Sequence, residues 1–121
     1  MNIVITGGSG GIGSAFAEAL AARPEVRKII ATCNRHSSAL YHPKVTWHRL
    51  DVTDDAAIRD WAAQLGEIDW LINAAGILHT RAHGPEKSIR QIDPVFFLEN
   101  MRINALPVLL LARHLHGKFR H

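Results

Sequence analysis

The chain has 121 residues, of which 47% are hydrophobic, and a formal net charge of +3. This composition is typical of one globular domain and excludes a chain that is disordered throughout. The basic residues are scattered apart from Lys118 and Arg120, so we expect no nucleic-acid partner. The purest apolar run, 108–112, is far shorter than the roughly 20 residues of a membrane span, so we expect no membrane partner.

The cysteine and histidine patterns favour a cytoplasmic protein without a metal site. Cys33 is the only cysteine, so no internal disulfide can form, which fits a reducing compartment. A strand that begins at Asn2 would leave no room for a signal peptide, and we therefore expect a cytoplasmic location. The eight histidines show no ligand spacing. His114 and His116 lie on different faces of a predicted helix, so we expect solvated histidines.

Apolar runs alternate with helical patterns along the chain. We predict strands at 2–6, 27–33, 45–50 and 68–74, and helices at 14–22, 55–65 and 95–116. Thr53 or Asp54 can cap the second helix, and Asp93-Pro94 opens the third. The alternation predicts a single domain over 1–121 with a doubly wound, Rossmann-type α/β fold and parallel strands in the order 3-2-1-4. We expect this sheet to be truncated after the fourth strand and the long helix that follows it.

A glycine-rich segment, 6–13, joins the first strand to the first helix. Its glycines permit a tight turn and a close approach to a pyrophosphate, and the helix N-terminus presents free N–H groups. This pattern predicts an adenine dinucleotide site with diphosphate contacts at Gly7, Ser9, Gly10, Gly11, Ile12 and Gly13. A plain turn is the alternative, because glycine clusters also form ordinary turns.

The end of the second strand is the place where the adenosine ribose is expected, about twenty residues after the glycines. Asn34 and Arg35 occupy this place, without the acidic residue that would accept the ribose hydroxyls of NAD. An arginine can pair with the 2′-phosphate of NADP, so we expect NADP as the cofactor, with NAD possible. The alternative for Arg35 is a solvated loop residue.

The third and fourth strands supply the remaining predicted contacts. Asp51 and Val52 follow the third strand, where a carboxylate points into the ligand crevice and can accept a hydrogen bond from an adenine amino group. Helix capping is the alternative for Asp51. The fourth strand ends in mostly small side chains that let a ring approach the backbone, or that form an ordinary turn: Asn73, Ala74, Ala75 and Gly76.

Taken together, these motifs resemble those of the short-chain dehydrogenase/reductase family, classical type. The resemblance rests on T-G-x-x-x-G-I-G at 6–13, D-V at 51–52, N-x-A-G at 73–76 and Asn104 in R-I-N-A, and it covers essentially the whole chain. The chain departs from the family at Ala74, where a second Asn is usual, and at Gly10, where NADP-dependent members often carry a basic residue. The segment 85–88 is similar to the branch of C-factor-like signalling proteins and small carbonyl reductases.

The resemblance implies reduction of a carbonyl or oxidation of an alcohol substrate with NAD(P)(H). The family's catalytic set is Asn, Ser, Tyr and Lys, with Tyr four residues before Lys, and only Asn104 has a counterpart here. Tyr41 is the sole tyrosine and Lys44 stands three residues later, on the adenosine side, so we assign this pair no role. We expect an N-terminal portion of a longer enzyme that is inactive alone; a naturally short non-catalytic form and a frame-truncated product are the alternatives.

The second hypothesis is a non-catalytic NAD(P)-binding module for signalling or sensing. The predicted helix 95–116 would present its apolar side to a partner, with Phe96, Phe97, Met101, Leu109 and Leu110 as the candidate surface. The alternatives for these residues are packing against the sheet and the helix-to-helix dimer contact that the family resemblance implies. We expect a homo-oligomer formed through this helix.

Overall fold

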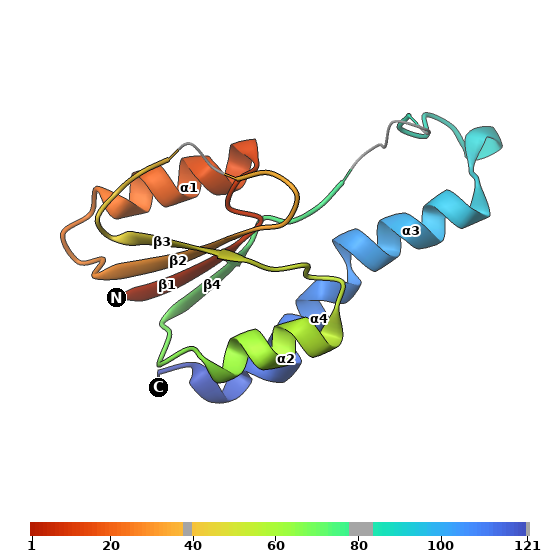
Figure 1. Cartoon of the computed structure of the whole chain (residues 1–121). Coiled ribbons are helices and arrows are strands. Elements are labelled where there is room, and N and C mark those ends of the chain that lie inside the picture. Colours follow the sequence, from red (N-terminus) through yellow and green to blue (C-terminus); the bar gives the residue numbers. More distant parts are fainter. Residues whose placement is uncertain (38–39, 78–83, 121) are drawn as a thin grey trace.

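The computed structural model describes residues 1–37, 40–77 and 84–120. In this part of the chain a single parallel sheet holds four strands in the order β3-β2-β1-β4 (Figure 1). Their bounds are β1 Asn2–Thr6, β2 Lys28–Cys33, β3 Val45–Arg49 and β4 Trp70–Asn73. The helices are α1 Gly11–Ala21, α2 Asp55–Ala63, α3 Pro94–Asn104 and α4 Leu106–Leu115, with short η1 Ile89–Gln91 and η2 His116–Lys118. This architecture confirms the predicted Rossmann-type fold and the predicted strand order.

Helices lie on opposite faces of the sheet, as Figure 1 shows, and an apolar layer packs on each face. Alternate residues of a strand face opposite sides, so Ile3 and Ile5 pack with α1 whereas Val4 packs with α2 and α4. The α1 layer contains Ala17, Leu20 and Ala21, and the other layer contains Ile58, Trp61, Ala62, Leu111 and Leu115. The core therefore fixes the sheet and leaves the carboxyl ends of its strands at one edge.

Helix boundaries follow the predicted capping residues, with small shifts. The Asp54 side chain caps α2 by accepting a hydrogen bond from the Ala57 N–H at 3.1 Å, and Asp93 caps α3 by accepting from the Val95 N–H at 2.9 Å. The first helix begins at Gly11 rather than at residue 14, because the glycine turn already runs into helical geometry. The second helix ends at Ala63, two residues before its predicted end.

The predicted helix 95–116 is in fact two helices, which corrects the sequence prediction. The break lies at Ala105, and Pro107 lies in the first turn of α4. A proline cannot donate the N–H that would continue the helix, and its ring clashes with the carbonyl four residues earlier. Figure 1 shows that α3 extends away from the sheet whereas α4 packs beside α2. Phe96 is the only residue of α3 that is buried.

The helical segment Pro94–Lys118 has the length and composition of a membrane-spanning helix, with 25 residues and a mean hydropathy of 1.5 in its most apolar window. The sequence analysis considered uninterrupted apolar runs only and did not take this longer helical segment into account. This observation is weak evidence for a membrane span, since core helices of soluble proteins pass the same test.

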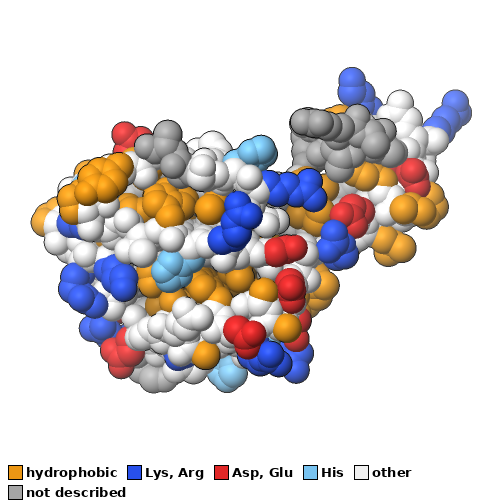
Figure 2. All heavy atoms as spheres, viewed as in Figure 1, with side chains coloured by type: hydrophobic (Ala, Val, Ile, Leu, Met, Phe, Trp, Pro, Cys, Tyr) orange, Lys and Arg blue, Asp and Glu red, His pale blue; other side chains and the backbone are white. Residues whose placement is uncertain are grey.

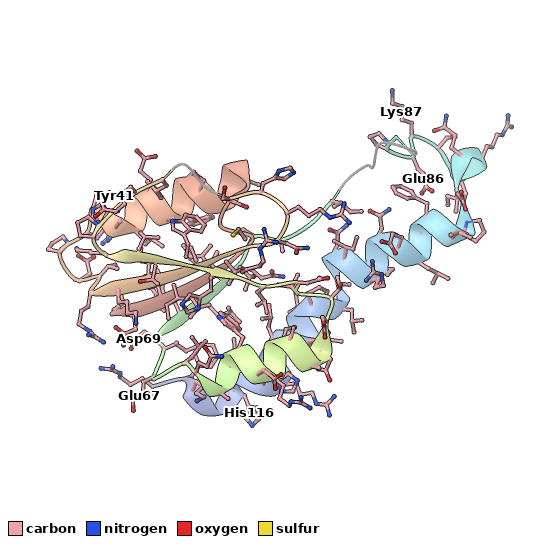
Figure 3. The ribbon with its side chains drawn as sticks, viewed as in Figure 1. Tyr41, Glu67, Asp69, Glu86, Lys87 and His116 are labelled. Atoms are coloured by element: carbon pink, nitrogen blue, oxygen red, sulfur yellow. The ribbon has the colours of Figure 1, made fainter. Side chains whose placement is uncertain are left out.

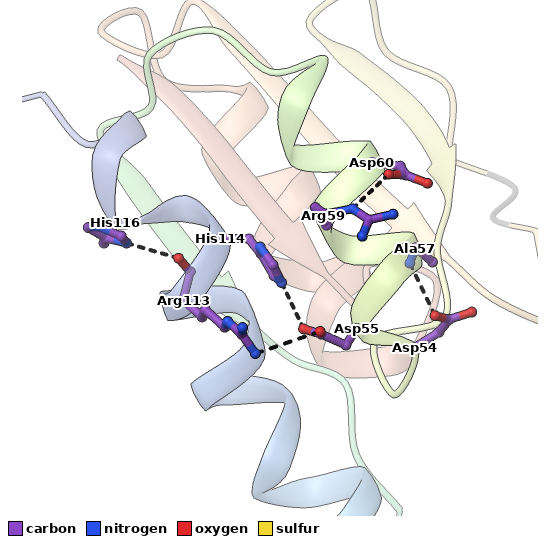
Figure 4. A network of polar contacts seen from close by, with 8 residues as sticks. All are labelled: Asp54, Asp55, Ala57, Arg59, Asp60, Arg113, His114 and His116. Carbon is purple, nitrogen blue, oxygen red and sulfur yellow. Dashed lines mark hydrogen bonds and ion pairs between the residues drawn. The ribbon is translucent and has the colours of Figure 1, made fainter.

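A polar network joins α2 to α4 (Figure 4). His114 Nε2 lies 2.7 Å from Asp55 Oδ1, and Arg113 Nη1 lies 3.7 Å from Asp55 Oδ2. The His114 side chain is 15% exposed, so the expectation of a solvated histidine was wrong at this position. The helical pattern did not show this, because Asp55 is 59 residues away in the sequence.

The last described residues lie beside the start of β4. Ile68 and Phe119 form a parallel bridge, with hydrogen bonds from Ile68 N–H to Lys118 O and from Arg120 N–H to Ile68 O, each 2.9 Å. Asp69 N–H donates to Asn2 O at 2.8 Å, so the backbone groups of Ile68 face away from β1. The bridge therefore occupies the position of a fifth parallel strand next to β4.

Candidate functional site

The turn between β1 and α1 contains close backbone contacts that the Cβ atom of any residue other than glycine would prevent. Gly7 has a φ of 69°, and a Cβ at this position would lie 2.5 Å from Ala75 N. A Cβ on Gly13 would overlap the Gly7 carbonyl oxygen, so α1 starts in contact with the turn. Gly10 stands at the N-cap of α1 and has no side chain that could accept the first helical N–H groups. These N–H groups are consequently available to a bound anion.

Hydrogen bonds from neighbouring strands hold the turn in place. Gly7 N–H donates to Thr32 Oγ1 at 3.3 Å, and Gly8 N–H donates to Thr32 O at 2.8 Å. The Thr6 hydroxyl donates to Asn73 Oδ1 at 2.6 Å and ties β1 to β4. Thr6 and Thr32 are buried, which makes these bonds part of the rigid sheet. The Asn73 side chain thus serves the junction of two strands and does not line the neighbouring cleft.

A cleft of about 430 Å³ lies at the carboxyl ends of the strands. It brings together most of the predicted cofactor contacts, namely Gly7, Ser9, Gly10, Asn34, Arg35, Asp51, Val52, Ala74, Ala75 and Gly76. Gly11, Ile12 and Gly13 are not among its lining residues: Ile12 is 72% exposed, and Gly13 packs on Gly7. The predicted residues from four strand ends therefore converge on one concave site.

Asp51 lies on the wall of this cleft as an ionised carboxylate. Its Oδ1 accepts hydrogen bonds from Thr53 N–H at 3.0 Å and from the Thr53 hydroxyl at 2.7 Å. The hydroxyl and the backbone N–H of Thr53 hold the pKa of Asp51 below its ordinary value, and the charges of Arg102 and Arg35 lower this pKa further. Asp54, not Asp51, caps α2, so the capping alternative for Asp51 is wrong.

Asn104 braces the loop that follows β4. Its Oδ1 accepts a hydrogen bond from Ile77 N–H at 2.6 Å, and its Nδ2 donates to Ile77 O at 2.7 Å. A Cβ on Gly76 would lie 2.7 Å from Asn104 Oδ1, so a side chain at this position would displace the Asn104 amide. Asn104 itself does not line the cleft, but Ile77 does. The end of α3 and the loop after β4 are therefore fixed to each other at the rim of the site.

Sequence reasoning missed several residues that line the cleft. Five of them are sequence neighbours of predicted contacts, and the strand ends could have indicated them: Cys33, His36, Leu50, Thr53 and Ile77. A sixth, Thr32, lies inside the second predicted strand. Glu99, Arg102 and Ile103 come from α3, which the sequence did not place against the sheet edge. Their spacing of three and four residues, which puts them on one side of a helix, was the signal available.

The Tyr41 and Lys44 pair lies at the other end of the sheet. Figure 3 shows Tyr41 near the amino ends of the strands, and its side chain is 90% exposed. Lys44 Nζ donates a hydrogen bond to Arg23 O, just beyond α1. Within the described ranges, no group of three or more His, Cys, Asp or Glu is placed to hold a metal ion.

These features define a class: a parallel α/β domain with a glycine turn and a cleft across its strand ends, as in dinucleotide-binding proteins. The family model for short chain dehydrogenase matches residues 1–120. The chain belongs to the short-chain dehydrogenase family.

Solved structures give the same result. The NADPH-bound carbonyl reductase from chicken fatty liver is 26% identical with a TM-score of 0.81, and the match covers 97% of this chain and 47% of that one. A putative short-chain dehydrogenase/reductase from Burkholderia multivorans with bound NADP is 25% identical with a TM-score of 0.84, covering 98% and 54%. Serine dehydrogenase from Escherichia coli, at 20% identity and a TM-score of 0.77, shares the fold, covering 98% and 56%. The chain spans about half the length of these structures.

Proposed function

We propose that this chain is the cofactor-binding half of an NAD(P)-dependent oxidoreductase that interconverts a carbonyl and an alcohol. The observation that carries the proposal is the uncapped start of α1 beside a cleft lined by four strand ends. The diphosphate of an adenine dinucleotide would accept hydrogen bonds from the first N–H groups of α1. Asp51 would accept a hydrogen bond from the adenine amino group, and Ala74 and Ala75 would leave room for the ligand.

NADP is the cofactor that we propose in preference to NAD. Arg35 is exposed and lines the cleft at the end of β2, where its guanidinium can pair with a 2′-phosphate. Its neighbours in the sequence, Asn34 and His36, are not acidic and so do not supply a carboxylate for the ribose hydroxyls of NAD. Two of the similar structures support this proposal, because the chicken carbonyl reductase is bound to NADPH and the Burkholderia protein to NADP.

The catalytic step would need groups that this chain does not supply. The cofactor provides hydride transfer, and the family resemblance implies a Tyr that gives a proton to the carbonyl oxygen and a Lys that lowers the Tyr pKa. We propose that both come from residues beyond His121. Asn104 would keep the loop at Ile77 in position, and the 121-residue chain would bind cofactor without turnover.

The exposed arm formed by α3 supports a second candidate function, a non-catalytic NAD(P)-binding module of the C-factor-like branch. Figure 2 shows hydrophobic side chains on the surface of this arm. The exposed apolar residues of α3 include Val95, Phe97, Leu98 and Met101, and Leu109 is exposed on α4. We propose a second copy of this chain as their partner.

Titration calorimetry of the 121-residue chain with NADPH and NADH tests the proposed function. We expect binding of NADPH, with weaker binding of NADH. An absence of heat with both nucleotides, for a chain whose circular dichroism shows it folded, would refute the proposal.

A further inference from the structure

The α3 wall of the cleft carries an arginine that the proposed cofactor contacts do not use. Arg102 Nε donates to Glu99 Oε2 at 2.9 Å, and Arg102 Nη2 donates to Glu99 Oε1 at 2.7 Å. Both side chains line the cleft, and that of Arg102 is 49% exposed. A two-point contact of this kind fixes the plane of the guanidinium and leaves its other N–H groups free to point elsewhere.

Arg102 and Asp51 both line this cleft. The negative charge of Asp51 helps to raise the pKa of Arg102, after the larger effect of Glu99, and Arg102 in turn lowers the pKa of Asp51. Figure 2 shows positively and negatively charged side chains close together where the arm meets the sheet. The lining of the cleft therefore includes a hydrogen-bond donor that Glu99 holds and an acceptor that Thr53 holds.

An adenine base matches this arrangement. Its edge carries an amino group that donates hydrogen bonds next to ring nitrogens that accept them. A planar guanidinium can also lie against the face of an aromatic ring. Two apolar residues, Val52 and Ile103, line the same cleft and can provide apolar contacts to the base.

We propose that Arg102, held in place by Glu99, contacts the adenine base of the bound nucleotide and acts as a specificity-determining residue together with Asp51. This inference rests on the proposed function, because it needs a nucleotide in the cleft. It assigns to α3 a direct part in cofactor recognition, in addition to its contact with the loop after β4.

Calorimetric titrations with NADPH and with ADP test the inference. ADP carries the adenine base but neither the 2′-phosphate nor the nicotinamide. We expect Arg102→Ala to weaken both ligands by about tenfold, the size of a good contact to a base edge. Arg102→Lys should weaken them to a similar extent, because lysine keeps the charge but not the planar fork. Glu99→Gln should cause a smaller loss, about threefold, since it loosens the guanidinium.

The matched control is Arg59→Ala. Arg59 is an exposed arginine that also pairs with an acid on its own helix, Asp60, but it does not line the cleft. We expect its NADPH affinity to equal that of the unchanged chain. Thermal unfolding of each variant checks that the fold is kept.

Three results would overturn the inference while the proposed function stands. The first is an unchanged affinity in Arg102→Ala. The second is a full rescue by Arg102→Lys, which would indicate long-range charge attraction. The third is a loss of NADPH affinity without a loss of ADP affinity, which would place Arg102 at another part of the cofactor. If the unchanged chain binds neither ligand, the proposed function and this inference are both refuted.

Discussion

Gly13 shows how one residue connects the sequence motif to the site. Because a Cβ here would overlap the Gly7 carbonyl oxygen, α1 could not keep its contact with the turn. We predict that Gly13→Ala lowers the free energy of unfolding by about 1–3 kcal/mol, as overpacking does, and abolishes NADPH binding. Chemical denaturation and calorimetry measure the two effects.

The control for this prediction is Gly66→Ala. A Cβ on Gly66 has no neighbour within 4 Å, and this residue lies outside the cleft. Its stability and NADPH affinity should stay near those of the unchanged chain. A Gly13→Ala variant as stable as the Gly66→Ala variant would contradict the close packing of the turn.

We predict that Arg35 determines the preference for NADPH over NADH. Arg35→Glu should weaken NADPH by about tenfold or more, because a charge-assisted hydrogen bond contributes about 1.5–3 kcal/mol and the new carboxylate repels a phosphate. NADH should be affected much less, since it lacks the 2′-phosphate. Calorimetry with both nucleotides measures the ratio, and an equal loss for both would show that Arg35 does not contact the 2′-phosphate.

At the scale of elements, the contact between α2 and α4 depends on Asp55. The hydrogen bond from His114 is the largest cause that lowers the pKa of Asp55, followed by the charges of Arg113 and His114. A carboxyl group whose pKa is lowered in the folded state stabilises the fold above its unfolded pKa, and the contribution is lost as pH falls through the folded pKa. We therefore predict a loss of stability below about pH 4, near the ordinary aspartate pKa.

Asp55→Asn should flatten this part of the pH dependence, whereas Asp60→Asn on the exposed side of the same helix should preserve it. Urea denaturation between pH 3 and 6, with both variants in parallel, provides the measurement. If Asp55→Asn and the unchanged chain lose stability in parallel through this range, the contact does not depend on the Asp55 charge.

Local sequence patterns were sufficient to predict the order of the strands and the residues that cap the helices. The strand order follows from alternating strands and helices, and the caps at Asp54 and Asp93 follow from residue type. The break at Ala105 could also have been predicted, because Pro107 cannot continue a helix. The bond between His114 and Asp55 could not, since it joins residues 59 positions apart through tertiary packing alone.

In the candidate site, too, local signals could be predicted from the sequence, whereas contacts made by tertiary packing could not. Glycines and strand ends are local signals, and they indicated most of the lining residues. The position of Arg102 in the cleft depends on how α3 packs at the edge of the sheet, which the sequence analysis did not predict. The sequence interpretation of Asn73 as a cofactor contact did not consider its bond with Thr6, which forms only when β1 and β4 pair.

At the scale of the whole molecule, the exposed apolar arm is the feature that most favours self-association. Phe97 is 49% exposed on α3, and neighbouring apolar residues extend the surface. We predict that the unchanged chain is oligomeric in analytical ultracentrifugation, and that Phe97→Glu shifts it towards monomer, because a charge cannot be buried unpaired at low cost.

Lys87→Glu, on the loop before α3, is the control for a change of charge outside this surface. It should sediment as the unchanged chain does. A monomeric unchanged chain would contradict the proposed contact between copies, and the arm would then need a different partner.

The proposed function depends on an adenine dinucleotide that lies across the carboxyl ends of the strands, with its diphosphate on the first N–H groups of α1. The most direct test is a crystal structure of the 121-residue chain grown with NADPH. We expect diphosphate oxygens within hydrogen-bond distance of backbone N–H groups between Gly10 and Gly13, and the adenine between Asp51 and Arg102. A nucleotide bound elsewhere, or a glycine turn closed over an empty cleft at saturating NADPH, would contradict it.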